Sequence, residues 1–132
     1  MRAIERALDA EGLFATREDD EETFRISFKS EGDRYFAVAY RNDPQFVMIG
    51  SGWALAPDVD ILRAVQTANM LNARKKFVKT AIWEDERDAL FTVELCYDEG
   101  YNLESAFPRL LDALRETTVE FFSALRGDPG SN

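Results

Sequence analysis

Histidine is absent from this chain of 132 residues, and cysteine occurs only once, at Cys96. Without histidine there is no histidine base to activate a serine or cysteine nucleophile, and no histidine metal ligand. A single cysteine excludes an internal disulfide, a redox pair and a cysteine-based zinc site. We therefore expect a protein that is not an enzyme and that has no catalytic residues, no cofactor and no metal ion.

Positive charge is also scarce, because 16 Lys and Arg residues face 25 Asp and Glu residues, giving a net charge of −9. Such a chain repels phosphate backbones and anionic lipids, so we expect no nucleic-acid partner and no membrane partner. No apolar run approaches the roughly 20 residues that span a bilayer. Residues 1–12 lack the apolar stretch of a signal peptide. These observations predict a cytoplasmic protein.

Helical and strand periodicities follow one another in a clear order. Helices are expected where apolar side chains recur every three to four residues, at 2–11, 58–73 and 103–126. Strands are expected where the period falls to two, at 24–29, 34–41, 45–53, 76–83 and 89–97. The order α-β-β-β-α-β-β-α predicts one α+β domain over residues 1–126, a five-stranded antiparallel sheet packed with helices. Residues 127–132 are expected to form a flexible tail.

Two short segments hold much of the negative charge. Residues 18–22 are all acidic, and residues 84–88 contain four more acids. Neither segment has the ligand spacing or the turn glycine of a calcium loop. Because like charges repel one another, both segments are expected to be solvated loops.

Several small motifs have two interpretations. Asn69 and Asn72 fall within the apolar arc of the middle helix, so they are expected to bond backbone groups at the helix exit or to contact a dimer partner or ligand. The segment 50–52 (Gly-Ser-Gly) follows a strand, but the third glycine and the lysine of a phosphate-binding loop are missing. It is expected to be a strand bend. The basic cluster at 74–79 is expected to form local ion pairs, and Cys96 to be an inert strand residue.

The second half of the chain resembles a known family. The segment 65–74 (VQTANMLNAR) runs into Lys76 and Phe77, and a stripe of leucine and phenylalanine follows Asn102. With the order of the elements, these motifs resemble the YbjN-like proteins, which share the fold of type III secretion chaperones. The usual turn glycine or proline is replaced here by Arg74-Lys75-Lys76. The resemblance implies a homodimer with a binding or sensory and regulatory role.

The expected strands at 34–41 and 45–53 are apolar on both faces. One face of the sheet is expected to be covered by the terminal helices, and the other by the middle helix, a second subunit or a bound protein segment. The residues expected to bind a partner are Phe46, Met48, Trp53 and Trp83. A dimer interface is expected at Leu71 and Asn72.

Two functions follow from these observations. The first is a non-enzymatic, chaperone-like or regulatory protein that acts as a homodimer on a protein segment, by apolar contact or by strand addition at a sheet edge. The alternative is a small-ligand sensory domain with an apolar pocket between the sheet and a helix.

Overall fold

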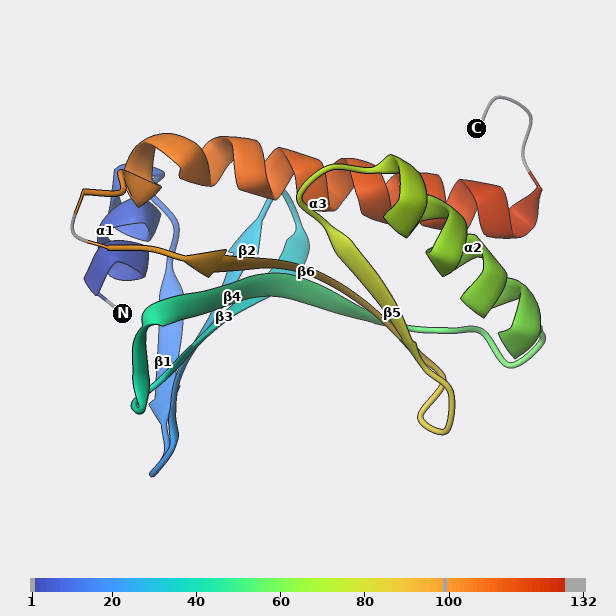
Figure 1. The fold of residues 1–132 in the computed structure, drawn as a ribbon, viewed down its shortest axis with the longest axis horizontal. Helices are drawn as coiled ribbons and strands as arrows, with labels where there is room; N and C mark the ends of the chain where they lie inside the picture. The colour runs from blue at the N-terminus through green and yellow to red at the C-terminus, as the bar shows by residue number, and fades with distance from the viewer. Residues whose placement is uncertain (1, 99, 128–132) are drawn as a thin grey trace.

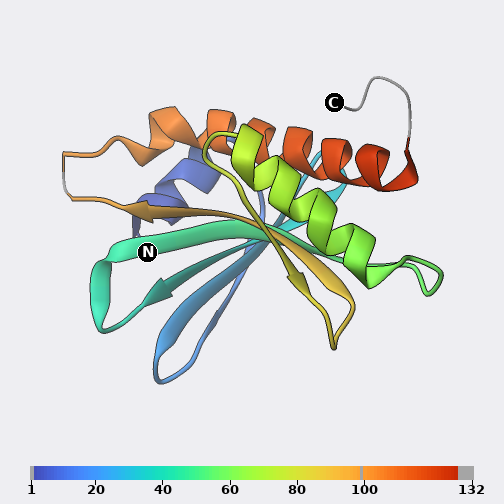
Figure 2. The same ribbon diagram turned by 45° about the vertical axis from the view of Figure 1, so that its right-hand side comes forward.

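Three helices lie along one side of a strongly twisted sheet in the computed structural model, which describes residues 2–98 and 100–127 (Figures 1 and 2). The helices are α1 (Arg2–Ala10), α2 (Ile61–Arg74) and α3 (Leu103–Arg126). The strands are β1 (Ala15–Asp19), β2 (Thr23–Ser30), β3 (Asp33–Tyr40), β4 (Asp43–Ala54), β5 (Lys79–Trp83) and β6 (Asp88–Cys96). All neighbouring strands are antiparallel, in the order β1-β2-β3-β4-β6-β5.

The predicted α+β domain with an antiparallel sheet is confirmed. The long last helix has the predicted bounds, and Gly127 ends it in the left-handed conformation with φ of 75°. Residues 128–132 of the predicted tail lie outside the described residues. The middle helix begins later than predicted, because its N-cap is Asp60, whose carboxylate accepts a hydrogen bond of 3.1 Å from the N–H of Leu62.

The prediction of five strands is wrong, because the described residues form a sixth strand, β1, that includes part of the acidic segment 18–22. Glu18 lies opposite Arg25 of β2, so the cross-strand neighbour carries the opposite charge. The Asp20 carboxylate closes the hairpin by accepting a hydrogen bond of 2.6 Å from the N–H of Thr23. This bond is the main reason that the pKa of Asp20 lies below its usual value. These local contacts offset the repulsion that predicted a loop.

One hydrophobic core lies between the helices and one face of the sheet, which we call the inner face. The sheet supplies buried side chains from β2, β3, β4 and β6, and all three helices contribute others, among them Ile4, Leu8, Ile26, Ala37, Val47, Ile49, Ala64, Leu71, Phe91, Val93, Phe107, Leu114 and Phe121. Helix α2 therefore packs on the same side as α1 and α3. The expectation that it would cover the opposite face is wrong.

The connection from α2 to β5 has an unusual backbone. Phe77 has φ of 72°, a conformation that a bulky side chain rarely adopts. The strand consequently begins at Lys79 and not at residue 76. The Phe77 ring lies 5.0 Å from the Arg109 guanidinium, which is a cation–π contact. Phe77 thus adopts the backbone conformation that glycine favours, in the segment where the usual glycine or proline is missing.

Asn72 joins α2 to the edge strand β5. Its side-chain amide donates a hydrogen bond of 2.9 Å to the carbonyl of Thr80 and accepts one of 2.8 Å from the N–H of Thr80. Both backbone groups of Thr80 that point away from β6 are therefore paired. An unpaired edge strand attracts other strands, and this contact closes the edge at its second residue.

We predict that Asn72→Ala lowers the free energy of unfolding by about 1–3 kcal/mol, because it leaves two partly buried backbone groups without partners. Urea denaturation measures the loss. Asn69→Ala is the matched control, since Asn69 is exposed on the same helix, and it should change the free energy by less than about 0.5 kcal/mol. A change in oligomeric mass with unchanged stability would instead place Asn72 at a dimer interface.

Candidate protein-binding face

The face of the sheet opposite the helices, here the outer face, is defined by the strand register. Val38, Met48 and Glu94 lie side by side on β3, β4 and β6, and so do Phe36, Gly50 and Thr92. Figures 1 and 2 show that no described helix crosses this side. The apolar side chains of the outer face stand outside the single core: Phe36, Val38, Tyr40, Phe46, Met48, Ala81, Trp83 and Leu90.

The centre of the outer face is tightly packed although none of the three described helices covers it. Val38 is only 3 % exposed. The Phe36 ring lies over Gly50, 3.0 Å from the point where a Cβ atom at that position would stand. Tyr40 and Phe46 continue the surface toward the β3–β4 turn, with ring centroids 5.7 Å apart. The result is a continuous apolar surface along β3 and β4.

The four residues expected to bind a partner fall on two faces. Phe46, Met48 and Trp83 lie on the outer face, and Trp83 is 55 % exposed. Trp53 lies on the inner face, where its ring packs 6.0 Å from that of Phe122 in α3. The structure therefore brings three of the four residues to one surface.

The two residues expected at a dimer interface are engaged within the chain. Leu71 is 2 % exposed and belongs to the core. Asn72 bonds the backbone of β5. The dimer interface at Leu71 and Asn72 stays a prediction.

A pocket of about 440 Å³ lies between α3 and the sheet, beside the first residues of β3 and the last residues of β4. Its apolar wall is formed by Trp53, Val119 and Phe122, and Tyr35 and Arg115 supply polar groups. Burial raises the pKa of Tyr35, and the charge of Arg115 opposes that shift. The Nη1 atom of Arg115 pairs with Glu31 at 3.2 Å, whereas its buried Nε has no protein partner. This pocket fits the alternative hypothesis of a small-ligand site.

Nothing in the described part of the chain resembles a metal centre, since no three His, Cys, Asp or Glu side chains gather there. None of the helices described is long and apolar enough to cross a membrane. Cys96 lies exposed at the end of the outer face, opposite Phe46.

A protein-family model described as "YbjN: Putative bacterial sensory transduction regulator" matches residues 2–127. The chain belongs to the YbjN family. The family resemblance seen in the sequence is thereby confirmed. No curated protein shows a significant match to this YbjN family member.

Two solved structures are similar to this YbjN family member. An uncharacterized protein from Methanothermobacter thermautotrophicus has a TM-score of 0.74 at 12% identity, over 96% of both chains. This similarity shows a shared fold. The heterodimeric complex ExoU-SpcU from the type III secretion system of Pseudomonas aeruginosa has a TM-score of 0.47 at 21% identity, over 89% of this chain and 93% of the other.

Sequence reasoning missed several residues of the outer face. Phe36 and Leu90 were not among the expected partner-binding residues, although each alternates with a buried neighbour. The signal was present at Phe36, because Tyr35 and Phe36 are successive large apolar residues in one strand. Only the register shows that Leu90 lies beside Gly52 on the same face.

The two glycines of β4 differ in the space around them. The segment 50–52 lies within β4 and not at a bend after it. A Cβ atom at Gly50 would overlap the carbonyl oxygen of Phe91 and lie 2.8 Å from the methyl group of Thr92. A Cβ atom at Gly52 would meet only the Leu90 side chain, at an ordinary 3.6 Å.

We predict that Gly50→Ala lowers the free energy of unfolding by about 1–3 kcal/mol or more, because β4 and β6 must separate to make room. Gly52→Ala is the matched control, because Gly52 lies two residues further along β4 on the same face. It should change the free energy of unfolding by less than about 0.5 kcal/mol. Thermal and urea denaturation of both variants measure the difference. Equal stability of the two variants would contradict the close approach at Gly50.

Proposed function

We propose that this YbjN family member is a non-enzymatic binding protein that holds a segment of another protein against the outer face of its sheet. The supporting observation is the apolar surface on β3 and β4 that none of the described helices covers. Large exposed apolar patches on soluble proteins mark interaction sites. The family description as a sensory transduction regulator agrees with a binding role.

The contact is proposed to run through side chains more than through a sheet edge. The β5 edge is closed at Thr80 by Asn72. The β1 edge is fully exposed but short, and it carries Glu18 and Asp19. Short, charged edges discourage strand addition. The apolar face is therefore the larger attractive surface.

We also propose that the chain is a homodimer, as the resemblance to type III secretion chaperones implies. Light scattering of the purified protein at tens of micromolar should give twice the chain mass of 15.1 kDa. A strict monomer would contradict the homodimer and leave the binding role intact.

A second function is supported by the pocket between Trp53, Phe122 and Arg115. Its volume of about 440 Å³ lies within the usual range for small-ligand sites, roughly 300–1,000 Å³. A ligand that binds the folded state raises the melting temperature. A rise in the melting temperature with one metabolite would favour a small-ligand sensor if Val119→Asp abolishes the rise and Met48→Asp keeps it.

The binding role is tested with the same two variants. Met48→Asp places a charge in the outer face and should weaken binding of a protein partner at least about tenfold, or about 1.4 kcal/mol. Val119→Asp is the matched control, because Val119 is 61 % exposed on α3, away from the outer face. A partner recovered from the native host by mass spectrometry and then titrated onto each variant supplies the measurement. Equal affinity for wild type and Met48→Asp would contradict the proposal.

A further inference from the structure

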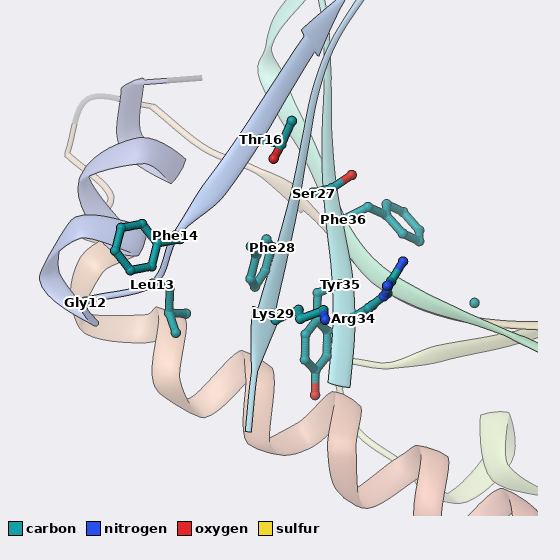
Figure 3. A pocket seen from close by; sticks show the side chains of 11 residues that line it. Gly12, Leu13, Phe14, Thr16, Ser27, Phe28, Lys29, Arg34, Tyr35 and Phe36 are labelled. Atoms are coloured by element: carbon teal, nitrogen blue, oxygen red, sulfur yellow. The ribbon is translucent and has the colours of Figure 1, made fainter. Parts of the chain in front are cut away.

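A groove of about 730 Å³ opens where the outer face meets the β2–β3 hairpin (Figure 3). Residues of the α1–β1 loop and of β1, β2, β3 and β4 line it, including Leu13, Phe14, Lys29, Arg34, Phe36 and Gly52. Figure 3 shows Arg34 and Phe36 pointing to one side of β3, while Tyr35 points to the other, toward α3. The groove therefore continues the apolar surface at Phe36, and its far end carries the charges of Lys29 and Arg34.

Two like charges stand opposite each other in this groove. Lys29 of β2 and Arg34 of β3 are directly paired in the antiparallel register, and both are exposed. Like charges in that position destabilise a sheet. Neither side chain has a carboxylate within 4.0 Å among the described residues, although the whole chain holds 25 acids.

Some basic residues of the described chain are paired, and others, such as Arg74 and Lys76, have no carboxylate within 4.0 Å either. Arg6, Arg17, Lys75, Lys79 and Arg115 each have a carboxylate partner within 4.0 Å. Two acids lie between the pair in sequence: Asp33 adjoins Arg34 but is not within 4.0 Å of either base, and Glu31 bonds Arg115 of α3 at 3.2 Å. Two adjacent positive charges beside the Phe36 ring therefore have no carboxylate partner within residues 2–98 and 100–127.

Apolar groups surround this positive pair. Phe36 follows Arg34 on the same face of β3, and Leu13 and Phe14 line the groove near α1. The Phe14 side chain is 95 % exposed, so it buries almost nothing within the chain. A ligand that fits this groove needs negative charge and apolar groups at short intervals. An extended peptide with alternating acidic and apolar residues has both.

We infer that the groove selects an acidic segment of a partner protein, with carboxylates at Lys29 and Arg34 and apolar side chains on Phe14 and Phe36. This inference rests on the proposed binding role of the outer face and names the chemistry of what it binds. A polyanion such as a nucleic acid fits less well, because a chain with a net charge of −9 repels long runs of phosphate. Carboxylates on Arg and Lys form charge-assisted hydrogen bonds, which are the stronger kind.

The test uses labelled synthetic peptides in which glutamate alternates with leucine and phenylalanine, and matched peptides with glutamine or lysine in place of glutamate. Fluorescence anisotropy against the full chain should rank glutamate first, glutamine second and lysine last. The affinity for the glutamate peptide should fall with added salt. The double variant Lys29→Gln/Arg34→Gln should weaken it about tenfold or more.

The matched control is Arg74→Gln/Lys76→Gln, two exposed basic residues outside the groove. Both double variants change the net charge from −9 to −9 − 2 = −11, so only the position of the charges differs. The control should bind the glutamate peptide within about twofold of wild type. The groove variant should melt no lower than wild type, because it removes a repulsive pair. A melting temperature at or above that of wild type excludes unfolding as the cause of any loss of binding.

Each other outcome overturns the inference in a distinct way. Equal affinity for all three peptides removes the preference for acids and leaves the proposed binding role standing. Binding of none of them contradicts the binding role as well. If the groove variant changes the oligomeric mass in light scattering, the occupant is a second copy of this chain and not a partner segment. If both double variants lose affinity for the glutamate peptide equally, net charge explains the loss and the position of the charges does not.

Discussion

The close approach of β3, β4 and β6 around Gly50 is the constraint on which the two faces of this sheet depend. Only a residue without a side chain leaves room for the Phe91 carbonyl and the Thr92 methyl group on one side and the Phe36 ring above. The resulting register sends Ile49 and Phe91 into the core and places Phe36 and Met48 outside. Because a slip of one residue exchanges the faces of a strand, this contact keeps the apolar outer face apart from the core.

The helices could have covered both faces, and specific contacts keep them on one. Arg63 of α2 donates hydrogen bonds of 3.0 and 3.2 Å to the carbonyls of Leu125 and Ala124, the last turn of α3. Lys75 pairs with Glu120 of α3 at 2.8 Å. With Asn72 bonded to β5, α2 is tied to α3 at both its ends and to the sheet edge between them. The outer face is left open because α2 is held elsewhere.

The sequence predicts those parts of the fold that depend on local pattern, and it fails where distant contacts decide. The helices and the two-residue period of most strands were readable, and so was the separation of Phe46 and Met48 from Val47 and Ile49. The strand β1 was missed because its acids are balanced by groups such as Arg25, whose position only the register reveals. The face of the sheet on which α2 packs was missed because it depends on Arg63, whose hydrogen-bond partners lie 61 and 62 residues further along the chain. Trp53 was included among the partner-binding residues although its odd position already placed it on the face of Val47 and Ile49.

Charge and shape act together on the outer face. Nine of the 25 acids lie in the segments 18–22 and 84–88, whereas Lys29 and Arg34, beside Phe36, have no carboxylate within 4.0 Å among the described residues. On the same face Lys79 does have a carboxylate partner, because it pairs with Glu94 at 2.8 Å. An unpaired, repulsive pair costs stability, and natural proteins retain that kind of cost mainly where a function depends on it. In the proposed binding role, the apolar contacts of this face would supply the attraction, and the two charges at one end would determine which segment fits and which way it lies.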